Sequence, residues 1–95
     1  MTPLHLAASY GHEKVVGLLL DRGASLSTTL VGSNSTALHI ASQHGREDVV
    51  RLLLARGASP TAVETDGSTP LHSAAVGGSE SIIRMLIGYG AEVGA

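Results

Sequence analysis

The chain repeats itself twice, and this internal similarity constrains its fold more than any other feature of the sequence. The segment Thr2 to Ser25 aligns without gaps with Thr36 to Ser59, and 15 of 24 positions are identical. The segment Thr36 to Ser59 aligns in the same way with Thr69 to Glu92, and 10 of 24 positions are identical. The offsets are 34 and then 33 residues, and the extra residue falls in a polar stretch between Ser25 and Asn34. A period of this length predicts a solenoid in which each unit packs on its neighbours.

Each unit has the pattern of a helix, a turn, a second helix and a loop. In the first unit, Thr2 suits the N-cap, and Pro3 suits the first helical position, which needs no N–H donor. Gly11 ends the first helix, because glycine readily adopts the left-handed conformation of a helix end. The second helix runs from about Glu13 to Arg22 and is apolar almost all round, as expected of a helix buried between two neighbours.

Charged residues on the second helices predict two ion pairs. Glu47 and Arg51 are four residues apart, and so are Glu80 and Arg84. Side chains at this spacing lie on one face of a helix, where such a pair adds about 0.2–0.5 kcal/mol. We therefore expect both pairs to form on exposed helix faces.

The connections between units carry turn signals. Asp66-Gly67 is a tight-turn dipeptide, and its counterpart in the first connection is Ser33-Asn34. Asparagine tolerates a positive φ better than most other residues, so each connection is predicted to be an extended, hairpin-like excursion. The first connection also contains Leu30-Val31, which is unusually apolar for an exposed tip. These two residues could bind a partner or fold back on their own helix pair, and we favour the second interpretation.

Composition excludes several classes of function. The chain has six Lys and Arg residues against eight Asp and Glu residues, and the cations form no cluster that could neutralise a row of phosphates. We therefore expect no nucleic-acid partner. We also expect no membrane partner, since the apolar runs are far shorter than the roughly 20 residues that span a bilayer. The sequence contains no cysteine, which excludes disulfides and thiolate metal sites and is compatible with the cytosol. We expect an intracellular location, cytoplasmic or nuclear.

Three histidines, His5, His39 and His72, recur at the repeat period and invite a metal hypothesis. Adjacent packed helices lie about 8–10 Å apart, whereas nitrogens that share one zinc ion lie within about 4 Å of each other. Equivalent histidines are therefore too far apart to share an ion. The serines lie mostly in turns, and the chain contains neither a Gly-x-Ser-x-Gly elbow nor a phosphate-binding loop. We expect no metal, no cofactor and no catalytic residue.

Motifs in all three units carry a family resemblance. The first unit contributes Thr2-Pro3-Leu4-His5-Leu6-Ala7-Ala8, Gly11-His12, Val15-Val16, Leu18-Leu19-Leu20 and Gly23-Ala24. The second unit has Thr36, Leu38-His39 and Ala41, and the third has Thr69-Pro70-Leu71-His72 and Ala74-Ala75. These motifs resemble the ankyrin repeat over almost the whole chain. The resemblance implies an all-α solenoid of stacked antiparallel helix pairs with hairpin-like loops, a single ankyrin-repeat domain over residues 1–95 with repeats at about 2–34, 36–67 and 69–95.

The same resemblance implies a non-catalytic module that binds a partner protein, without a cofactor, through the loop tips and the exposed side of the first helices. At matching positions the loop candidates are Ser33, Ser35, Thr65, Asp66 and Ser68, and the first-helix candidates are Ser9, Tyr10, Gln43, His44 and Val76. Tyr10 is the strongest anchor, because tyrosine is enriched at interface hot spots, although it could instead pack on the next repeat. The resemblance also implies that each repeated histidine braces its own helix start by hydrogen bonding.

Two other functions stay open, a structural spacer within a longer ankyrin array and a regulatory segment attached to an enzyme in a longer chain. Neither end of the repeat series has the polar outer face of a capping repeat. We therefore expect a segment of a longer array or an incomplete gene product. Exposed apolar ends predict that the isolated chain is marginally stable or self-associates.

Overall fold

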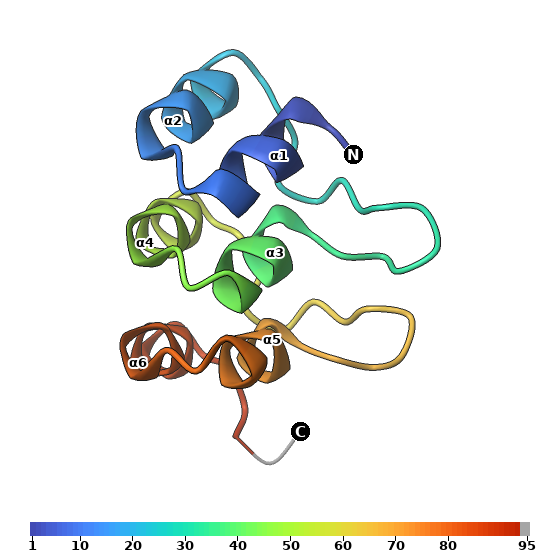
Figure 1. Ribbon diagram of the computed structural model, residues 1–95, viewed down its shortest axis with the longest axis vertical. Helices are drawn as coiled ribbons and strands as arrows, with labels where there is room; N and C mark the ends of the chain where they lie inside the picture. The colour runs from blue at the N-terminus through green and yellow to red at the C-terminus, as the bar shows by residue number, and fades with distance from the viewer. Residues whose placement is uncertain (94–95) are drawn as a thin grey trace.

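The computed structural model describes residues 1–93, which form three antiparallel helix pairs stacked in sequence order (Figure 1). The pairs are α1 (Pro3–Tyr10) with α2 (Glu13–Asp21), α3 (Ala37–Gln43) with α4 (Glu47–Ala55), and α5 (Pro70–Gly77) with α6 (Glu80–Gly88). Helices α1, α3 and α5 form one layer and α2, α4 and α6 the other, and two loops project beyond the first layer (Figure 1). No β-strand occurs among the described residues, and the predicted all-α solenoid is confirmed.

The ends of the helices are the ones that the sequence predicts. The Thr2 side chain accepts a hydrogen bond from the His5 N–H at 3.2 Å, and Pro3 opens α1. Gly11 caps the other end of α1 with a φ of 75°, and its N–H reaches the carbonyls of Ala7 and Ala8. The polar backbone groups freed at both ends are therefore satisfied locally, which fixes the length of the helix.

The core is aliphatic and passes through all three helix pairs. One contiguous cluster of buried side chains draws on all six helices, and its largest fully buried members are Leu38, Leu53, Ile82 and Leu86. Helix α1 packs on α3 and α3 on α5, while α2 packs on α4 and α4 on α6. The middle helix is the most enclosed, because every residue from 35 to 42 is buried. Within residues 1–93, no helix has both the length and the apolar character needed to cross a membrane.

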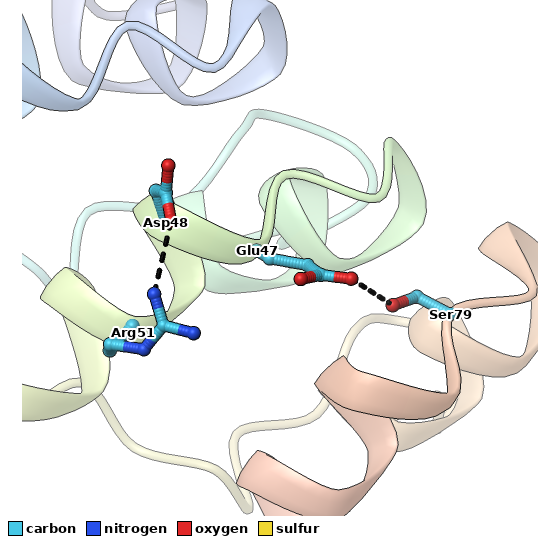
Figure 2. Close-up of polar contacts among 4 residues, drawn as sticks. All are labelled: Glu47, Asp48, Arg51 and Ser79. Atoms are coloured by element: carbon cyan, nitrogen blue, oxygen red, sulfur yellow. Dashed lines mark hydrogen bonds and ion pairs between the residues drawn. The ribbon is translucent and has the colours of Figure 1, made fainter.

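The predicted ion pairs on the second helices form in one case only. Arg84 pairs with Glu80, as expected. The prediction that Glu47 pairs with Arg51 is wrong, because Arg51 binds Asp48 instead, with 3.0 Å between Nη1 and Oδ1 (Figure 2). Glu47 turns toward the next helix pair, where its carboxylate accepts a hydrogen bond from the Ser79 hydroxyl at 3.5 Å (Figure 2). Asp48 lies one turn from Arg51 on the same face and thus replaces Glu47 as its partner.

A buried hydroxyl stands out within the middle repeat. Ser42 in α3 is fully buried, and its Oγ has no hydrogen-bond partner among the described residues. The equivalent positions in the other two repeats hold Ala8 and Ala75, which have no polar side-chain atom to satisfy. A buried polar group without a partner costs about 1–3 kcal/mol, because it gives up its bonds to water on folding.

Replacing Ser42 by alanine is therefore expected to raise the free energy of unfolding by about 1–3 kcal/mol. Urea unfolding followed by circular dichroism measures the change. Ser73→Ala is the matched control, since Ser73 is also buried but its hydroxyl donates to the Thr69 carbonyl at 3.5 Å. A Ser42→Ala variant that is no more stable than the parent chain would show that the hydroxyl finds a partner.

Candidate protein-binding surface

The two loops that join the helix pairs close on themselves like hairpins. In the first loop the Leu30 N–H donates to the Ser35 carbonyl at 3.0 Å, and in the second the Glu64 N–H donates to the Ser68 carbonyl at 2.8 Å. These bonds enclose residues 30–35 and 64–68, so the extra residue of the first loop lies within its tip. Inside the tips, Asn34 has a φ of 59° and Gly67 a φ of 87°, as the turn signals predict.

Hydrogen bonds join the two loop tips to each other. The Thr65 N–H donates to the Ser33 carbonyl at 2.8 Å, and the Thr65 hydroxyl donates to the Gly32 carbonyl at 2.8 Å. The Ser35 hydroxyl also donates to the Glu64 carboxylate. A groove of about 310 Å³ lies between the tips, and it is lined by Gly32, Ser33, Glu64, Thr65 and Asp66. The bonds between the tips hold this groove in one shape.

The first two repeated histidines tie their helix starts to the base of the following loop. In the second repeat, His39 Nδ1 accepts the Thr36 N–H at 3.2 Å, so the ring proton is assigned to Nε2. That nitrogen donates to the Ser68 carbonyl at 3.1 Å. His5 Nε2 contacts the Ser35 carbonyl in the same way at 3.2 Å, and burial lowers the pKa of His5 below its usual 6.5. The predicted bracing of the helix starts is confirmed, and it also positions the loops.

The first-helix candidates lie mostly at the surface. Tyr10, Gln43, His44 and Val76 are exposed, and Ser9 is half-buried. The Tyr10 ring stacks on His12 of its own repeat, with 5.9 Å between the ring centroids. Tyr10 is 62% exposed, so the alternative in which it packs into the next repeat does not hold.

The loop candidates differ in accessibility. Ser33, Thr65 and Asp66 are exposed, and Ser68 is half-buried. Ser35 is only 7% exposed and its hydroxyl donates to Glu64, so it is the least accessible of the loop candidates, and its role as a partner contact stays a prediction. Glu64 was not among the predicted surface residues. It stands at the position equivalent to Leu30 of the first loop, and this change from an apolar to an acidic residue is the sequence signal that could have indicated it.

The apolar tip of the first loop does not fold back as a whole. Leu30 is half-buried, but Val31 is fully exposed, so the prediction that both residues pack on their own helix pair is wrong for Val31. The tip of this loop is one residue longer than that of the second, and Val31 stands in its turn. A branched apolar side chain is thereby presented to solvent at the edge of the surface.

The acidic residues of this surface lie at the second loop tip, whereas Arg46 contacts the far end of α1, where its Nε donates to the Ser9 carbonyl at 2.9 Å. Helices α1, α3 and α5 contain no Asp, Glu, Lys or Arg residue. Glu64 and Asp66 lie at the tip, and the Ser68 N–H donates to Asp66 Oδ1 at 2.9 Å. This hydrogen bond lowers the pKa of the Asp66 carboxyl, which is therefore ionised at neutral pH.

Comparisons with known proteins agree with this architecture. A family model described as "Ankyrin repeats (3 copies)" matches residues 27–95, and another described as "Ankyrin repeat" matches residues 1–29. No curated protein matches the chain. The crystal structure of the human ASB11 ankyrin repeat domain is similar with a TM-score of 0.92 and 29% sequence identity, over 97% of this chain and 41% of that one. The chain thus spans less than half the length of that structure. On the family matches, the chain belongs to the ankyrin repeat family, whose members generally serve as non-catalytic protein-interaction modules.

Proposed function

We propose that the chain binds a partner protein, without a cofactor, through the loop tips and the exposed side of α1, α3 and α5. The observation that carries this proposal is variation at equivalent exposed positions. Tyr10, His44 and Gly77 occupy one such position, and Ser9, Gln43 and Val76 occupy the position before it. The threonines and leucines around them recur in all three repeats. A constant framework with variable exposed residues supports recognition of one particular partner. Ankyrin repeat proteins are often intracellular, and we place the interaction in the cytoplasm or nucleus.

The charge distribution supports a partner with cationic groups opposite the loop tips. Glu64 and Asp66 lie close together at the second loop tip, so the tip carries a local negative charge. Complementary charge favours association and orients the partner. Tyr10 and Val76 add apolar contact area along the uncharged first helices.

The triple replacement of Tyr10, His44 and Asp66 by alanine is expected to abolish partner binding. All three side chains are exposed. Tyr10 lies at the end of α1, His44 directly follows α3, and Asp66 lies in the tip of the second loop, so the three replacements cover both the first-helix side and the loop side of the proposed surface. The partner is first captured from an extract of the source organism and identified by mass spectrometry. Its binding to the parent and variant chains is then measured by titration calorimetry.

Lys14, Arg51 and Ser81 provide the matched control for that experiment. All three are exposed but lie on the second helices, away from the proposed surface. Their joint replacement by alanine should leave binding unchanged, and circular dichroism should show the same helicity for both triple variants. Equal binding by the parent chain and the Tyr10, His44 and Asp66 variant would refute the assignment of the surface.

A further inference from the structure

Each of the three prolines in the chain directly follows a serine or a threonine, in Thr2-Pro3, Ser59-Pro60 and Thr69-Pro70. Proline-directed serine/threonine kinases select a proline at this place, directly after the hydroxyl that they phosphorylate. Proline has no N–H donor for the kinase to satisfy, and it favours an extended backbone at the residue before it. The sequence therefore offers three sites of this pattern, and the structure separates them.

Two of the three hydroxyls are engaged at helix starts. Thr2 and Thr69 are the N-caps of α1 and α5, and the proline after each opens its helix. The Thr2 hydroxyl contacts His5 Nδ1 at 2.6 Å, and the Thr69 hydroxyl contacts His72 Nδ1 at 2.9 Å. Thr2 is half-buried and Thr69 is buried. A kinase would have to unwind the first turn of the helix to reach either hydroxyl, so both threonines are protected in the folded chain.

The third hydroxyl, that of Ser59, lies outside every helix of the described residues, in the connection that follows α4. Ser59 is exposed, and Pro60 is half-buried. The Ser59 oxygen accepts a hydrogen bond from the Thr61 N–H at 3.3 Å, which holds it at the surface. Ser59 belongs to the middle repeat, so it is exposed even though a helix pair packs on either side of its own.

The third repeat shows that this position accommodates a negative charge. Ser25, Ser59 and Glu92 occupy equivalent positions in the three repeats. In each repeat the N–H of the alanine just before this position donates to a leucine carbonyl of the second helix at 2.9 Å, so the backbone is held in the same way. Glu92 is exposed. A phosphoserine, which carries about −1.5 to −2 charges at neutral pH, would likewise stand in solvent at position 59.

We propose that Ser59 is a phosphorylation site for a proline-directed serine/threonine kinase. The Ser59 hydroxyl oxygen attacks the γ-phosphorus of the ATP that the kinase binds, and a new P–O bond forms. The bond from that phosphorus to the β,γ-bridging oxygen breaks, ADP leaves, and the catalytic base of the kinase takes the hydroxyl proton. The inference is independent of the proposed partner binding, because Ser59 lies outside the loop tips and the first helices.

The first repeat provides an internal control for the kinase class. Residues 22–25 and 56–59 both have the sequence Arg-Gly-Ala-Ser, but Ser25 is followed by leucine instead of proline. Ser25 is exposed as well. A kinase that reads the arginine would modify both serines, whereas one that reads the proline modifies the second serine alone. The arginine of the second segment already pairs with Asp21 at 2.9 Å, which favours the proline as the determinant.

Phosphorylation of the full 95-residue chain in vitro tests the proposal. The chain is incubated with MgATP and a purified proline-directed kinase that is active on a Ser-Pro peptide, and tandem mass spectrometry maps the modified residues. One phosphoryl group is expected, on Ser59. Ser59→Ala should lose it, and so should Pro60→Leu, which keeps the hydroxyl and copies the sequence of the first repeat. Ser25→Ala is the matched control and should be phosphorylated like the parent chain.

Four results would overturn the inference. They are a parent chain that stays unmodified, phosphate on Thr2 or Thr69 in place of Ser59, phosphate on Ser25 to the same extent as on Ser59, and a Pro60→Leu variant that is modified at the parental rate. Circular dichroism checks that each variant keeps its helices. If Pro60→Leu loses helicity, Pro60→Ala is used, and the same loss of phosphate is expected.

Discussion

Leu53→Ala is expected to lower the free energy of unfolding by about 2–5 kcal/mol. Leu53 lies in α4 and is fully buried in the core cluster that all six helices share. Its loss removes apolar contacts and leaves a cavity that a closely packed interior fills only in part. Folded domains are stabilised by about 5–15 kcal/mol in all, so this single change removes a large share of the total. Urea unfolding followed by far-ultraviolet circular dichroism measures it.

Leu18→Ala is the matched control for this prediction. Leu18 lies in α2, in a helix of the same length, but its side chain is 53% exposed. Surface replacements of this kind usually change stability by no more than about 0.5 kcal/mol. Equal losses in the Leu53 and Leu18 variants would contradict the assignment of Leu53 to the shared core.

Gly77→Ala is expected to lower the free energy of unfolding by about 1–3 kcal/mol, because it forces two helices apart. A Cβ atom added at Gly77 in α5 would lie 2.6 Å from the Gln43 carbonyl oxygen and 2.8 Å from the Ser42 carbonyl oxygen. Both atoms belong to the backbone of α3, so no side-chain rotation can relieve the clash. Thermal unfolding of the variant should begin at a lower temperature than that of the parent chain.

Two other helical glycines serve as controls with the opposite expected sign. A Cβ atom at Gly88 in α6 meets no atom within 4 Å, and one at Gly17 in α2 meets only Leu52 Cδ2, at an ordinary 3.6 Å. Alanine has a higher helix propensity than glycine by up to about 1 kcal/mol, so both replacements should stabilise the chain or leave it unchanged. A Gly77→Ala variant that behaves like these two would disprove the close approach of α3 and α5.

The helical framework could be predicted because local and long-range signals agree. Thr-Pro marks the starts of α1 and α5, a glycine lies at or just after the end of each helix, and the repeat period places the helices in register with each other. The actual partners of Glu47 and Arg51 could not be predicted from the four-residue spacing of these two residues. Asp48 competes for the arginine within the same helix, and Ser79 from the next repeat attracts Glu47. The choice of partner thus depends on a residue that is distant in sequence.

The candidate surface could be predicted less completely than the framework. Tyr10 and Asp66 are both exposed, as expected of partner contacts, but the repeat pattern left open whether Tyr10 packs on the next repeat. Ser35 is buried, and its hydroxyl donates to Glu64, which lies 29 residues away in the other loop. Val31 points outward because the extra residue lengthens the tip that holds it. Contacts between two loops leave no periodic trace in the sequence.

The enclosure of the middle helix has a consequence for how the molecule opens. Residues 35–42 are buried because helix pairs cover them on both sides, whereas each outer pair is covered on one side. In stacked repeats, stability is close to a sum of unit and nearest-neighbour terms. The outer pairs therefore fray first while the central pair persists. Backbone amides of α3 and α4 should exchange their hydrogens with solvent last, as expected of the most cooperative part of a repeat protein.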